Sequence, residues 1–132
     1  MGYSNQKEKE MNLNNLFKFG AVWNGLFGVM MLFAGSTVME GFGFTPTDDL
    51  LMMSTYMGVS MLAMGVIHWF IPMYAGDNLK KYGMIVAPFW GAFAALDGYH
   101  YAVGNQPFIA QNIVMTLIMA VFALMFFIKS KD

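Results

Sequence analysis

Residues 79–103, with the sequence LKKYGMIVAPFWGAFAALDGYHYAV, decide the fold. They begin with leucine and a lysine pair and continue as a mostly apolar run with small residues at helical spacing. Asp97 and His100 stand near the far end. A helix over residues 80–103 is long enough to cross a hydrocarbon core of about 30 Å, because a helix rises about 1.5 Å per residue. The stretch therefore predicts a membrane-spanning helix that carries a polar site near one end.

The composition of the whole chain favours a membrane protein. Of the 132 residues, 58% are hydrophobic and 11% are charged, whereas about 25% are charged in an ordinary soluble domain. A soluble domain of this size leaves much of its surface in water and could not hide so much apolar area. The net charge of −1 argues against nucleic acid as a partner, which normally requires a basic face. The absence of cysteine excludes disulfides and thiolate metal sites.

Three further stretches are apolar and long enough to span a membrane. We predict an all-α integral membrane protein, a four-helix bundle formed as one domain over residues 16–132. Residues 1–15 are polar and are predicted to form a loose or interfacial cytoplasmic tail. The predicted spans are residues 17–39, 50–74, 80–103 and 108–128.

The positive charges predict the orientation of these spans. All seven lie in the N-terminal region, in the second loop or in the C-terminal tail, and the first and third loops contain none. This alternation fits the positive-inside rule and places both termini in the cytoplasm, as we expect for a bacterial inner-membrane protein. As an alternative, cleavage near residues 34–36 (AGS) would leave three spans and a less complete charge bias. The seven residues are Lys7, Lys9, Lys18, Lys80, Lys81, Lys129 and Lys131.

The two halves of the chain resemble each other. Residues 16–22 (LFKFGAV) align with residues 79–85 (LKKYGMI), and two later glycines of the first span then align with glycines of the third. The pattern predicts two repeated helical hairpins of the same orientation, related by an axis along the membrane normal.

Asp97 and His100 are the first candidate site, because residues three apart lie on one face of a helix. Ionisable side chains in membrane spans usually face protein or water and often serve a function. Asp48 and Asp49 follow Thr47, a pattern that predicts a helix start with Thr47 as its N-cap. These two aspartates and Glu40 are also predicted on the same outer side of the membrane, so they could join Asp97 and His100 in binding a divalent metal or in a proton relay. The alternative is a hydrogen-bonded pair of Asp97 and His100 that fixes helix packing.

His68 is a second candidate, for binding a cofactor. It is predicted near the inner end of the second span, in an aromatic belt with its imidazole reaching the headgroup region; contact with a quinone is the alternative. From the rise per residue, the depths of His68 and His100 differ by roughly 20 Å. This difference argues against a haem held by both histidines, and nothing in the sequence requires a cofactor.

Helix packing is predicted at several positions. Pro88 removes a backbone donor and predicts a kink that a neighbouring helix satisfies. Asn24, in the middle of the first span, is expected to make an interhelical hydrogen bond. The third span carries overlapping small-xxx-small motifs, which allow helices to approach closely in lipid; these are Gly83, Ala87, Gly91 and Ala95.

Methionines recur at helical spacing in the second span. Thioethers select Cu(I), so a methionine ladder is one interpretation. Methionine also fills gaps in packed cores, and a stripe at helical spacing is what a bundle core requires. We therefore expect these residues in the core: Met53, Met57, Met61 and Met64.

The layout is similar to that of the small DoxX-like membrane proteins. Four short-linked spans, internal termini, glycine-rich first and third spans and the first-loop sequence GFTP (residues 43–46) carry the resemblance, with Phe19-Gly20 and Gly25-x-x-Gly28 as local support. The resemblance covers most of the chain at the level of layout. It implies a link to quinone-dependent oxidases, which some members accompany, and it transfers no functional residue.

The function expected from the sequence is that of a non-catalytic accessory or assembly subunit of a larger membrane complex, such as a respiratory one. The expected partners are the bilayer and other membrane subunits or further copies of the chain. No nucleotide-binding loop, nucleophile triad or zinc helix is present in the sequence. The alternatives are a small oligomeric transporter or metal-binding protein that uses Asp97 and His100, and a component of a quinone-linked oxidoreductase.

Overall fold

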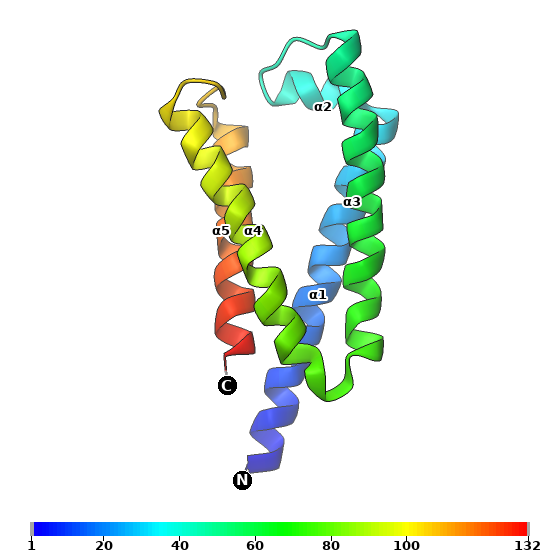
Figure 1. Cartoon of the computed structure of the whole chain (residues 1–132), viewed down its shortest axis with the longest axis vertical. Helices are drawn as coiled ribbons and strands as arrows, with labels where there is room; N and C mark the ends of the chain where they lie inside the picture. Colours follow the sequence, from blue (N-terminus) through cyan, green and yellow to red (C-terminus); the bar gives the residue numbers. More distant parts are fainter. Residues whose placement is uncertain (1, 132) are drawn as a thin grey trace.

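The computed structural model describes residues 2–131, with side chains from residue 13 onward. Within this part the chain is all-helical and has no strand, which confirms the all-α part of the predicted fold class. The elements, shown in Figure 1, are α1 (Gly2–Phe33), α2 (Gly35–Gly41), α3 (Asp48–Tyr74), the 3-10 helix η1 (Gly76–Asn78), α4 (Leu79–Ala102) and α5 (Ala110–Ser130).

Three of these helices are long and apolar enough to cross a membrane. They are the Leu13–Phe33 part of α1, α3, and α5. Helix α4 has 24 residues, but its two lysines, its aspartate and its many small residues make it less apolar than the others. The structure therefore supports a membrane protein with three candidate spans, and α4 is not one of them.

The first predicted span differs from the structure at both ends. Helix α1 begins at Gly2, so the backbone of residues 2–15 is helical and continuous with the span. At the other end α1 stops at Phe33, and α2 follows after a bend at Ala34. A Cβ atom on Gly35 would lie 2.7 Å from the Ser54 hydroxyl oxygen, so the chain turns where it contacts α3 closely.

The start of α3 is capped by a side chain. The Thr47 hydroxyl accepts a hydrogen bond from the Leu50 backbone N–H at 3.3 Å. Asp48 and Asp49 occupy the first turn, where negative charge complements the positive end of the helix dipole. A polar N-cap satisfies a backbone donor that the helix itself leaves unpaired.

The long helices form two antiparallel hairpins (Figure 1). Helix α1 packs along α3, and α4 packs along α5, whereas contacts between the hairpins are few. The hairpins meet at the end that holds both termini and the α3–α4 turn, and they diverge toward the end that holds α2. We call these the convergent end and the open end. Both hairpins start at the convergent end, as the repeat predicts, but α2 has no helical counterpart between α4 and α5.

Glycines hold the first hairpin together. A Cβ on Gly28 would lie 2.9 Å from the Gly58 carbonyl oxygen, and a Cβ on Gly58 would lie 2.9 Å from the Gly28 carbonyl oxygen. Closer to the convergent end, a Cβ on Gly65 would lie 3.0 Å from the Ala21 carbonyl oxygen. The two backbones therefore approach so closely that only glycine fits, which is the packing expected of helices in lipid.

The second hairpin combines aromatic, small and polar contacts. The rings of Trp90 and Phe122 stack with centroids 4.7 Å apart. A Cβ on Gly91 would lie 3.7 Å from the Ala123 Cβ, an ordinary contact. Toward the open end, Thr116 of α5 donates a hydrogen bond of 2.7 Å to the Asp97 carboxylate of α4.

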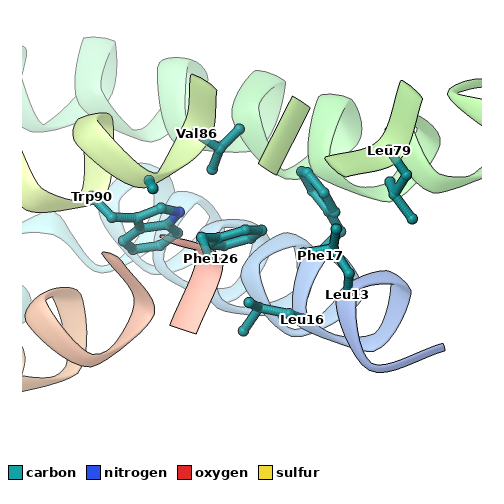
Figure 2. Packing of buried hydrophobic residues seen from close by; sticks show 8 residues of the cluster. Leu13, Leu16, Phe17, Leu79, Val86, Trp90 and Phe126 are labelled. Carbon is teal, nitrogen blue, oxygen red and sulfur yellow. The ribbon is translucent and has the colours of Figure 1, made fainter. Parts of the chain in front are cut away.

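A buried apolar cluster joins the hairpins at the convergent end (Figure 2). Its residues come from α1, α4 and α5, and one of them, Leu79, is the first residue of α4. Partly buried residues of α1, α3 and α5 pack against it. The cluster consists of Leu13, Leu16, Phe17, Leu79, Val86, Ala87, Trp90 and Phe126.

At the open end, the segment around α2 reaches the second hairpin. The buried Asn112 side chain of α5 donates hydrogen bonds to the carbonyl oxygens of Phe42, at 3.1 Å, and Pro107, at 2.8 Å. Gly41 lies against Gln111, and a Cβ at Gly41 would be 2.9 Å from its amide nitrogen. The hairpins are thus connected at both ends, by side-chain packing at one and by an asparagine at the other.

Candidate functional site

His68 lies where the two hairpins converge. It is only 1% exposed, and its ring is surrounded by three aromatic rings from the other long helices. The centroid distances are 5.8 Å to Phe17 of α1, 6.0 Å to Trp90 of α4 and 6.2 Å to Phe126 of α5. All four long helices therefore contribute to the surroundings of one imidazole.

Gly20 of α1 makes room for this ring. A Cβ at Gly20 would lie 3.0 Å from His68 Cδ2 and 3.6 Å from both His68 Nε2 and Trp90 Cζ2. A Cβ atom at this position would therefore crowd the His68 ring and make an ordinary contact with Trp90. The close approach of backbone to imidazole fixes the position of His68 between α1 and α4.

The hydrogen bonds of His68 make its two nitrogens unequal. Nδ1 lies 2.9 Å from the Met64 carbonyl oxygen, and since a carbonyl only accepts, Nδ1 carries a proton and donates it. In the neutral imidazole, Nε2 is then an acceptor. This atom is buried and has no hydrogen-bond partner among the described residues. A buried polar atom without a partner costs about 1–3 kcal/mol, and a neutral Nε2 can accept a proton, accept a hydrogen bond or bind a metal.

The prediction for the environment of His68 was wrong. The imidazole was predicted to reach the headgroup region, but the structure buries it in the helix junction. Its neighbours Trp69 and Phe70 are the exposed aromatic residues of this segment. The helix turns His68 inward because it continues the buried face of α3 that also contains Ser54, Gly58 and Gly65.

The structure does not bring Asp97, His100 and Glu40 together. The Asp97 carboxylate is bonded to Thr116, and the His100 ring lies edge-on against Tyr99 at a centroid distance of 5.4 Å. Glu40 is exposed on α2. Among the residues whose side chains are described, no group of three or more His, Asp or Glu side chains is arranged to hold a metal ion.

Asp97 instead ends a chain of hydrogen bonds between α4 and α5. Gln106 donates to the Tyr101 hydroxyl at 3.4 Å, and that hydroxyl lies 3.1 Å from the Thr116 hydroxyl. Because the Thr116 hydroxyl donates its proton to Asp97, the Tyr101 hydroxyl is the donor in its hydrogen bond with Thr116. The network therefore joins α4, through Asp97 and Tyr101, to Thr116 of α5 and to Gln106 in the loop between the two helices.

The predicted packing residues differ in their surroundings. On α4, Gly83 and Ala87 are buried, and a Cβ at Gly83 would collide with the Ser130 hydroxyl. Ala95 and Pro88 are exposed, and α4 continues through Pro88 as a single helix.

Asn24 is buried as expected, but its bond was predicted wrongly. Its side-chain nitrogen donates to the Gly20 carbonyl oxygen of its own helix at 2.8 Å, not to another helix. The amide thereby finds an acceptor one turn away, without needing a polar partner on α3.

No family model, curated protein or solved structure matches this chain. The resemblance to DoxX-like proteins stays an expectation based on layout.

Proposed function

We propose that the chain is an integral membrane protein that spans the bilayer four times, with α4 as the fourth span. The 24 residues of α4 extend about 36 Å at about 1.5 Å per residue, which exceeds a hydrocarbon core of about 30 Å. All lysines whose side chains are described lie toward the convergent end. Under the positive-inside rule, that end and both termini face the cytoplasm, here of a bacterial inner membrane.

We further propose that the protein is a non-catalytic accessory or assembly subunit of a larger membrane complex. The observation that carries this proposal is the outer half of the small-residue face of α4. Gly83 and Gly91 lie against α5, but Ala95 is exposed and a Cβ at Gly98 would meet nothing within 4 Å. Small residues allow close helix contacts in lipid, so this face suits a helix of a partner subunit.

The test is native mass spectrometry of the protein extracted from its own membrane in mild detergent. We expect larger subunits bound in a fixed ratio, and we expect Ala95→Leu to release them because the added side chain blocks close approach. Ala63→Leu, at an exposed position of α3, is the matched control and should retain them. A chain without partners, or equal retention by both variants, would contradict the proposal.

A ligand-binding function at His68 is the second candidate, because Nε2 is a buried acceptor without a partner among the described residues. A quinone-linked role is one form of it, since a quinol hydroxyl could donate to this nitrogen. The test is chemical analysis of the gently extracted protein for bound quinone or chromophore, with His68→Phe as the comparison. A ligand found in both proteins, or in neither, would remove this candidate.

A further inference from the structure

An apolar groove runs between α1 and α5, and its lining residues Leu16 and Phe122 also border the apolar cluster at the convergent end. It has a volume of about 370 Å³, within the range of about 300–1,000 Å³ that is typical of small-molecule sites. Leu16 and Phe19 of α1 form one wall, and α5 forms the other from Val114 to Met125, through Val121. Every lining side chain is apolar, so an occupant of the groove must be apolar as well.

The groove opens at the surface of the protein. Phe19 is 68% exposed, and Val114 and Val121 are also exposed. These residues belong to two of the candidate membrane spans, Leu13–Phe33 and Ala110–Ser130. In a bilayer the groove would therefore open sideways into the hydrocarbon, where acyl chains are the available apolar molecules.

A positive charge stands at the convergent end of the groove. Lys129 follows Met125 by one turn of α5, and residues four apart lie on the same helix face. No hydrogen bond or ion pair joins the Lys129 ammonium to another residue of the described part of the chain. The remaining lysines whose side chains are described gather toward the same end, namely Lys18, Lys80, Lys81 and Lys131.

Three acidic residues lie at the end of the molecule opposite to the lysines. Glu40, Asp48 and Asp49 lie on α2 and at the start of α3, at the open end and away from Lys129, whereas Asp77 of η1 lies in the turn at the convergent end. Basic residues between membrane helices on the cytoplasmic side attract anionic headgroups. An apolar groove that ends in a lysine thus matches a molecule with an acyl chain and a negative head.

We propose that this groove binds one phospholipid with a net negative headgroup. One acyl chain lies along the α5 wall, and the phosphate pairs with the Lys129 ammonium at the cytoplasmic surface. The site rests on the proposed membrane insertion, but it does not depend on a partner subunit. It is separate from the small-residue face of α4, so lipid and partner can bind together.

The experiment uses the full chain reconstituted with equal amounts of phosphatidylglycerol and phosphatidylcholine, followed by gentle extraction and native mass spectrometry. We expect one retained lipid, with phosphatidylglycerol favoured about fivefold, since each lysine near an anionic lipid surface contributes about 1 kcal/mol. Lys129→Gln should abolish this preference, whereas Lys131→Gln should keep it. Lys131 is a matched control because its ammonium lies 5.9 Å from the Phe127 ring centroid, away from the groove wall.

A second pair of variants tests the groove itself. Val121→Trp fills the groove and should remove the retained lipid, whereas Val66→Trp, at an exposed position of α3, should not. Co-flotation with vesicles separates the two proposals: a chain that fails to float contradicts membrane insertion. A chain that floats but retains no lipid, shows no headgroup preference, or holds a protein helix at this groove overturns the lipid site alone.

Discussion

Replacing Gly28 by alanine should destabilise the first hairpin, although alanine is the better helix former. The added Cβ would lie 2.9 Å from the Gly58 carbonyl oxygen and from the Leu62 nitrogen, and 2.7 Å from Leu62 Cγ. Because two of these atoms are backbone, α1 and α3 must move apart. Overpacking of this kind costs about 1–3 kcal/mol, and the gain in helix propensity is about 0.8–1 kcal/mol. We expect a net loss of up to about 2 kcal/mol in the free energy of unfolding.

Gly25→Ala is the matched control for this substitution. It lies one turn away on α1, and a Cβ there would meet nothing within 4 Å, so only the propensity gain of up to about 1 kcal/mol applies. Unfolding in mixed micelles with increasing dodecyl sulfate, followed by circular dichroism, measures both variants. The expected difference between them is about 2 kcal/mol, or about 30-fold in the equilibrium constant. Equal stability of the two variants would refute the close contact between the backbones of α1 and α3.

Three further substitutions test the other contacts by the same unfolding measurement. His68→Ala leaves a cavity among aromatic rings and should cost about 2–4 kcal/mol; an unchanged unfolding midpoint would contradict the burial of the imidazole. Thr116→Val removes the donor to Asp97 and should cost about 1–3 kcal/mol, whereas Thr55→Val, at an exposed hydroxyl bonded within its own helix, should cost less. Asn112→Ala removes the hydrogen bond to the α2 segment, so the distance between spin labels on α2 and α5 should broaden in pulsed EPR; an unchanged distribution would rule out this link.

Much of the helical framework follows from the sequence because the physical signals are local. Long charge-free runs indicate spanning helices, and Thr47 followed by two aspartates indicates a helix start, which the hydrogen bond to Leu50 confirms. The break at Ala34 is less visible, since residues 17–39 contain no charge apart from Lys18. It depends on the contact between Gly35 and Ser54, which only the folded hairpin creates.

The buried face of α3 was predicted wrongly, and the proposed membrane insertion supplies a physical reason. Methionines were expected in the core, yet Met53 is 53% exposed and Met57 and Met64 are exposed as well. In water, burial follows hydrophobicity; in a bilayer, lipid is as apolar as methionine, and small or polar residues mark the interface instead. The spacing of the buried residues of α3 was therefore the informative pattern: Ser54, Gly58, Gly65 and His68.

The environment of His68 could not be predicted from one helix. Its position on the small-residue face of α3 indicates that it points inward, but the three rings around it come from three other helices. The link between Asn112 and the Phe42 carbonyl joins residues 70 positions apart. Such contacts depend on how the hairpins are placed against each other, which local spacing does not encode.

The contacts that hold each hairpin together differ in kind from those that join the two hairpins. Within the first hairpin, glycines allow backbone contacts that no side chain could replace; within the second, stacked rings and the Asp97 bond join the helices. Between the hairpins, the contacts include the apolar cluster with the aromatic rings around His68 at the convergent end, and the Asn112 bond and the contact of Gly41 with Gln111 at the open end. The Gly28 and His68 substitutions therefore probe different levels of the fold: the first should weaken the pairing of α1 and α3, and the second should weaken the joint between two hairpins that each remain paired. Because the unpartnered nitrogen lies in this joint, any proton or ligand that His68 accepts would act on the relation between the hairpins.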